Sequence, residues 1–132
     1  MKKLVLLSLV SLMSVSSFAA DSFKCYRTAK SYPDFGDHFT AVLSSRTIRL
    51  VGIRDIRVSG TLDPKYRPRP QNAGSLRYLA RVDSPGSGTG CDHAQIMLNK
   101  SMASGRNGLL TIAYDCDSDG TGPLFYVFSC QR

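Results

Sequence analysis

Residues 76–82 read Leu-Arg-Tyr-Leu-Ala-Arg-Val, the cleanest alternation of apolar and polar side chains in this chain. Successive side chains of a β-strand point to opposite faces, so a period of two predicts a strand with one buried face. The side chains expected to face inward are Leu76, Tyr78, Ala80 and Val82. Arg77 and Arg81 would then face solvent. This stretch therefore predicts a half-buried strand.

The same period recurs on both sides of this strand, and no segment shows a sustained helical period. Every acidic residue is Asp, which favours turns, and the helix former Glu is absent. Within 47–59 the alternation shifts around Gly52, which predicts a bulge or bend. The fold class is therefore all-β, a small antiparallel barrel or sandwich of six to seven strands. The other expected strands are residues 23–28, 38–43, 47–59, 91–98, 109–116 and 124–130.

Residues 60–75 form the longest stretch without alternation and are rich in Pro, Arg and Asn. Proline at this density excludes a helix interior and a central strand. We expect a long exposed loop with extended, polyproline-like backbone.

Residues 1–20 have the features of a secretory signal peptide: Lys2 and Lys3 precede an apolar run over residues 4–13. That run is too short to anchor the chain across a membrane. Cleavage after Ala19 places the small residues Ser17 and Ala19 at the positions that a signal peptidase reads. It is favoured over cleavage after Ala20, which would put bulky Phe18 at the third position before the cut. Residues 21–132 are expected to be a single exported domain, periplasmic or secreted, with no membrane span.

The four cysteines all follow the leader, and an even set in an exported chain predicts two disulfides. The absence of a Cys-x-x-Cys pair argues against a zinc knuckle or a thioredoxin-like redox site. If strands 91–98 and 109–116 form a hairpin, residue 91 lies opposite residue 115. The predicted bonds are therefore Cys91–Cys116 and Cys25–Cys130, the second tying the first strand to the last.

The charge of the chain is concentrated in its middle, because residues 46–81 hold nine basic residues and two acidic ones. The cluster could bind a polyanion, such as a lipopolysaccharide head group or nucleic acid, or it could merely solvate the outer faces of strands. Guanidinium groups grip phosphates or sulfates, and a tyrosine can stack on a ring. The candidate ligand-binding residues are Tyr66, Arg67, Arg69, Arg77 and Arg81.

The sequence Asp-Cys-Asp-Ser-Asp-Gly at residues 115–120 matches the first half of a calcium-binding loop. The twelfth position of such a loop normally holds a Glu that binds calcium through both carboxylate oxygens, but here it holds Tyr126. A solvated turn is therefore the preferred interpretation, and calcium is the one cofactor that a motif suggests. The candidate metal ligands are Asp115, Asp117 and Asp119.

No catalytic residue is assigned. His38 and His93 each follow an aspartate, but adjacent strand residues point to opposite faces, so neither pair forms a ready catalytic dyad. The favoured function is an exported binding or interaction module, whose partner is an anionic ligand or an envelope protein. The alternatives are a small secreted hydrolase that uses His and Asp residues, and an accessory subunit of an envelope assembly.

Overall fold

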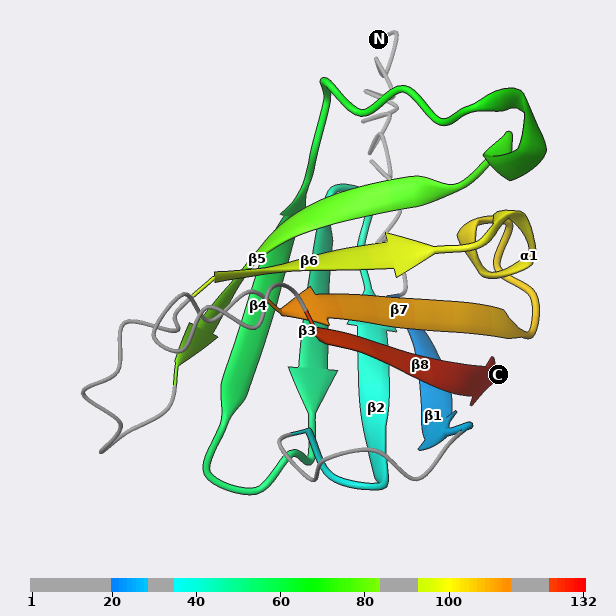
Figure 1. The fold of residues 1–132 in the computed structure, drawn as a ribbon. Coiled ribbons are helices and arrows are strands. Elements are labelled where there is room, and N and C mark those ends of the chain that lie inside the picture. The colour runs from blue at the N-terminus through cyan, green and yellow to red at the C-terminus, as the bar shows by residue number, and fades with distance from the viewer. Residues whose placement is uncertain (1–19, 29–34, 84–92, 115–123) are drawn as a thin grey trace, which may run out of the picture.

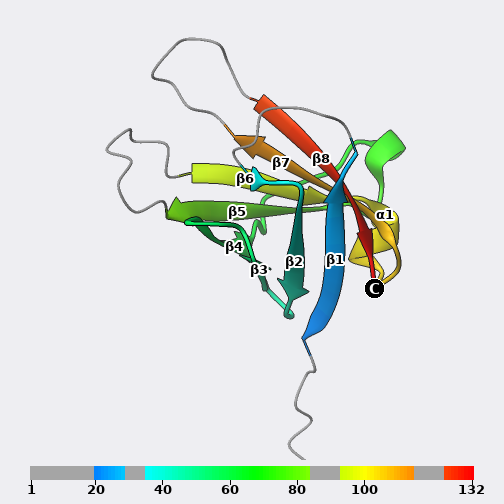
Figure 2. The ribbon, with the colours of Figure 1, turned by 90° about the horizontal axis from the view of Figure 1, so that it is seen from below.

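In the computed structural model, which describes residues 20–28, 35–83, 93–114 and 124–132, the strands close into an antiparallel barrel (Figure 1). Each strand pairs with its neighbours in sequence, and β8 returns to pair with β1 (Figure 2). The strands are β1 (Asp21–Arg27), β2 (His38–Leu43), β3 (Thr47–Val51), β4 (Arg57–Leu62), β5 (Leu76–Asp83), β6 (His93–Leu98), β7 (Gly108–Tyr114) and β8 (Leu124–Gln131).

The prediction of an all-β fold is confirmed, and of the two expected architectures the chain adopts the barrel. The expected number of strands, six to seven, was too low, because residues 47–59 contribute to two strands instead of one. Gly52 and Asp55 both have left-handed backbone, with φ of 91° and 57°, and the chain reverses between β3 and β4. Leu50 consequently pairs with Val58 across a hairpin. The expected bend is thus a complete turn.

The loop expected over residues 60–75 begins three residues later, because Gly60–Leu62 complete β4. It holds a short 3-10 helix, Pro70–Asn72. Gly60 faces the barrel interior, where a Cβ atom would lie 3.0 Å from Ile48 Cγ2 and 3.3 Å from Ala80 Cβ. A glycine in this strand therefore permits close approach of neighbouring strands and does not end the strand.

One short helix, α1 (Lys100–Ala103), connects β6 to β7. The Asn99 side chain caps it by accepting a hydrogen bond from the backbone nitrogen of Met102 at 3.1 Å. Met102 is fully buried. Among the described residues no helix combines the length and apolar character needed to cross a membrane.

The barrel interior is filled by apolar side chains, as alternating strands require. Phe39 and Phe128 meet edge to face with ring centroids 4.6 Å apart. Phe35 packs in the same manner on Tyr114 and Tyr126, at 5.4 and 5.1 Å. Packing of this kind leaves the outer face of the sheet as the accessible surface.

The Cys25–Cys130 disulfide is present, as predicted, and it joins residues that face each other across β1 and β8. Cys91 and Cys116 lie outside the described residues. The expected register of β6 and β7 was wrong by two residues, since Ala94 lies opposite Tyr114 and not opposite Ile112. A shift of two preserves the face of every side chain, so the alternation alone could not distinguish the two registers.

Candidate anion-binding face

The residues predicted to bind an anion do not form one patch. Arg77 is paired within the protein: its Nη2 and Nε atoms lie 2.6 and 3.0 Å from Asp63 Oδ2. Its guanidinium also stacks over the Tyr66 ring, 4.7 Å from the centroid. The Tyr66 hydroxyl in turn lies 3.1 Å from Ser75 Oγ. These contacts fasten the start and the end of the loop to β5.

Asp63 is the acidic partner in this arrangement, and its side chain is only 7 % exposed. The hydrogen bond from Arg77 lowers the pKa of Asp63 below its ordinary value of 3.8, and the backbone nitrogen of Lys65, 3.0 Å from Oδ1, lowers the pKa further. The carboxylate is thus held in its charged form. Arg77 therefore serves the loop and is not available to an external anion.

Because folding lowers this pKa, Asp63 stabilises the fold above its unfolded pKa, and that stabilisation is lost as the pH falls through the lower folded pKa. The variant Asp63→Asn is therefore expected to have a smaller free energy of unfolding than the wild type at pH 7. The difference should shrink as the pH falls below about 3.8. Urea denaturation of the wild type and the variant at pH 7 and pH 2.5 measures the difference in the free energy of unfolding at each pH. Asp83→Asn, which alters an exposed carboxylate at the end of β5, is the control; a pH-independent loss in D63N would contradict the assignment.

The two loop arginines lie apart from the strand arginines. Arg67 donates from Nη1 to the carbonyl oxygens of Pro64 and Tyr66, at 3.0 and 3.1 Å. Arg69 precedes the 3-10 helix and is exposed. Arg81 shares the outer face of β5 with Arg77 but lies four residues further on, about 13 Å along the strand.

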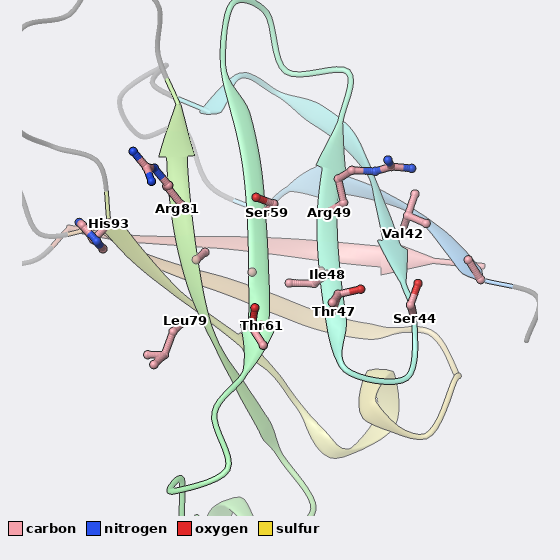
Figure 3. A pocket seen from close by; sticks show the side chains of 13 residues that line it. Val42, Ser44, Thr47, Ile48, Arg49, Ser59, Thr61, Leu79, Arg81 and His93 are labelled. Atoms are coloured by element: carbon pink, nitrogen blue, oxygen red, sulfur yellow. The ribbon is translucent and has the colours of Figure 1, made fainter.

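Arg81 instead joins residues from other strands. It lies opposite Ser59 of β4, and Ser59 lies opposite Arg49 of β3, so the three form a row across the outer face of the barrel (Figure 3). Val42 extends the row on β2, and His93 of β6 lies opposite Arg81. We call the set Arg49, Ser59, Arg81 and His93 the basic row.

The basic row lines a shallow groove of about 560 Å³. The hydroxyl-bearing side chains that line the groove come from β3, from β4 and from the turn after β2: Ser44, Thr47, Ser59 and Thr61. In Figure 3 the two guanidinium groups extend to either side of Ser59. The groove therefore combines cations with neutral hydrogen-bond donors.

Arg49 and Arg81 have no acidic partner within 4.0 Å in the described parts of the chain. Both are exposed. The ion pairs found there are Arg27–Asp37, Arg54–Asp55, Arg77–Asp63 and Arg132–Asp21. No ion pair within the described residues therefore neutralises the two arginines of the basic row, which gives this face a positive potential.

Sequence reasoning singled out Arg81 but missed Arg49. The pattern Ile-Arg-Leu at residues 48–50 did indicate that Arg49 points outward. What no pattern indicated is that β3 and β5 flank β4, which brings residues 49 and 81 into one row.

Of the other residues that the sequence singled out, His93 lines this groove. Asp115, Asp117 and Asp119 lie outside the described residues. His38 begins β2 and His93 begins β6, with three strands between them in the sheet order. Within the residues that the structure describes, no three His, Cys, Asp or Glu side chains gather as metal ligands.

Comparison of the chain with protein-family models, with curated proteins and with solved structures finds no match in any of the three, so the geometry of the described residues is the basis for inferring function.

Proposed function

We propose that this protein is an exported binding module that holds a polyanion, one bearing sulfate or phosphate groups, against the basic row. The observation that carries the proposal is the pairing of Arg49 and Arg81 on one face of the sheet, each without a carboxylate partner among the described residues. The planar guanidinium group of an arginine without an acidic partner is suited to bidentate contacts with sulfate and phosphate.

The spacing of the two arginines supports a ligand with repeated charges. Adjacent strands lie roughly 4.8 Å apart, so the Cα atoms of Arg49 and Arg81 are separated by about 10 Å. The long arginine side chains can reach two neighbouring anionic groups of one polymer or one group between them. The Ser59 hydroxyl lies midway and can donate to the same ligand.

Export fits this arrangement. The Cys25–Cys130 disulfide supports a location outside the cytoplasm, because such bonds persist in oxidising compartments. Ala20 lines the same groove as the basic row. Signal-peptide cleavage after Ala19 would create an α-ammonium group at Ala20, which would add a third positive charge to the groove.

Chromatography and titration on heparin, a sulfated polysaccharide, test the proposal. The variant Arg49→Ser with Arg81→Ser should bind more weakly than wild type. The slope of log affinity against log salt should fall by about 2, close to one for each lost contact.

The matched control is Arg67→Ser with Arg69→Ser, which removes the same charge from the loop. It should retain most of the affinity, with only the loss expected from a lower net charge. Equal weakening in both double variants would mean that only net charge matters, and greater weakening in the control would place the site on the loop. Either result would overturn the proposal.

A further inference from the structure

A small cavity opens at the end of the barrel where α1 lies (Figure 1). Its walls come from the start of β1, the end of β2, the start of β5 and the end of β6, and residues of α1 complete them. The cavity has a volume of about 270 Å³. The mouth of a barrel is a common place for a small ligand to bind. The apolar part of the lining is made by Leu43, Leu76, Leu98, Met102 and Ala103.

One buried polar group in this cavity has no partner among the described residues. Tyr78 points into the barrel from β5, and its side chain is only 3 % exposed. Its hydroxyl makes no hydrogen bond with any other residue that the structure describes. In that same part of the chain, every side-chain nitrogen or oxygen atom that is sealed from solvent does have a partner. The Tyr78 hydroxyl is therefore not sealed, and it opens into the cavity that Tyr78 lines.

The protonation state of this hydroxyl makes it a donor. Burial raises the pKa of Tyr78 above its ordinary value of 10.0, and no hydrogen bond or neighbouring charge contributes to the shift. At neutral pH the hydroxyl therefore keeps its proton and can donate it to an acceptor that enters the cavity.

The lining carries no unpaired charge. Asp21 is the one charged residue among those that line the cavity. Arg132 donates from Nη2 to Asp21 Oδ1 at 2.7 Å and from Nη1 to the carbonyl oxygen of Gly105 at 3.1 Å. The cavity therefore presents apolar surface and hydroxyl groups, a combination that suits a neutral ligand, because a charged one would lose its hydration without gaining a counter-ion.

We propose that this cavity binds a small neutral molecule with an apolar body and an oxygen acceptor that the Tyr78 hydroxyl contacts. Cavities of roughly 150 Å³ hold benzene, so the larger volume here admits an aromatic ring with a short substituent. A ligand with an acceptor gains a hydrogen bond from Tyr78 that a hydrocarbon of the same shape does not. The proposal does not depend on the anion-binding function, since no residue of the basic row lines this cavity.

An NMR titration of the isotope-labelled domain with acetophenone tests the proposal. Cumene, in which a methyl group replaces the carbonyl oxygen, is the matched ligand. Chemical-shift changes should concentrate at Tyr78, Leu98 and Met102. Tyr78→Phe should weaken acetophenone binding about fivefold, the effect of one lost neutral hydrogen bond, and should leave cumene binding unchanged.

A second pair of variants tests the location of the site. Ala103→Leu places a larger side chain in the cavity from α1 and should abolish measurable binding of both ligands. Ala73→Leu makes the same replacement at an exposed position outside the cavity and should bind both ligands like wild type. Thermal melting should show all three variants folded. Tyr78→Phe should be no less stable than wild type, because the hydroxyl has no partner among the described residues.

The proposal is overturned if acetophenone does not bind, or if its chemical-shift changes lie away from the cavity. Equal acetophenone affinity in wild type and Y78F would mean that the hydroxyl contacts no ligand, and unchanged binding in A103L would place the ligand elsewhere. A lower melting temperature in Y78F would mean that the hydroxyl supports the fold instead. Each of these results leaves the anion-binding function standing, because heparin binding should be the same in wild type and Y78F.

Discussion

Replacement of Cys25 and Cys130 together by alanine is expected to lower the free energy of unfolding by about 4–5 kcal/mol. The disulfide closes a loop with a sequence separation of 105, and cross-linking a loop of that length restricts the unfolded chain by roughly this amount. Such a loss is a large share of the total stability of a small domain.

The position of the bond in the barrel adds to its importance. The ladder between β1 and β8 spans only Lys24–Arg27, whereas that between β7 and β8 spans Gly108–Tyr114. The disulfide lies within this short seam, where the barrel closes (Figure 2). Without it, β1 and β8 would separate more readily and expose two sheet edges.

Urea denaturation without reductant measures the effect. A C25A/C130A variant within 1 kcal/mol of wild type would contradict the structural role given to this bond. Reductant added to the double variant tests the predicted Cys91–Cys116 bond separately: a further loss of stability is expected, and no change would refute that pairing.

Phe128→Ala is expected to cost about 3–5 kcal/mol, the usual range for removing a large buried aromatic side chain. Phe128 is fully buried and packs edge to face on Phe39. The interior is well filled around it, so alanine would leave a cavity that the rigid barrel closes only in part.

Phe125→Ala provides the matched control, because it removes the same atoms from the same strand. Phe125 points outward and is 60 % exposed, so its loss should change the free energy of unfolding by less than about 0.5 kcal/mol. Chemical denaturation of the two variants gives the comparison. Equal effects would mean that Phe125 is buried in solution or that Phe128 is not.

The features of the fold that were predictable from sequence are those encoded locally. Alternation in residues 76–82 predicted β5 with its inward and outward faces, and assigning Cys91 to Cys116 in one hairpin left Cys25 to pair with Cys130. The β3–β4 turn was missed because apolar Val51 and Ile53 flank Gly52, so the polar cluster that normally marks a turn is absent. Left-handed backbone at Asp55 is likewise not visible in a pattern of hydrophobicity.

The candidate site depended on contacts that sequence patterns do not encode. Asp63 and Arg77 are 14 residues apart, and their pairing removes Arg77 from the predicted patch. Arg49 and Arg81 come together only because the chain forms an ordered meander in which β4 separates β3 from β5. Strand order, more than strand existence, thus determines where the positive charge gathers.

The most direct test of the account is an NMR titration of the isotope-labelled domain with a short heparin oligosaccharide. Chemical-shift changes should concentrate at Arg49, Ser59, Arg81 and His93, the basic row, and should diminish with added salt. Changes confined to the loop of residues 63–75, or no changes at low salt, would contradict the assignment of the anion-binding face.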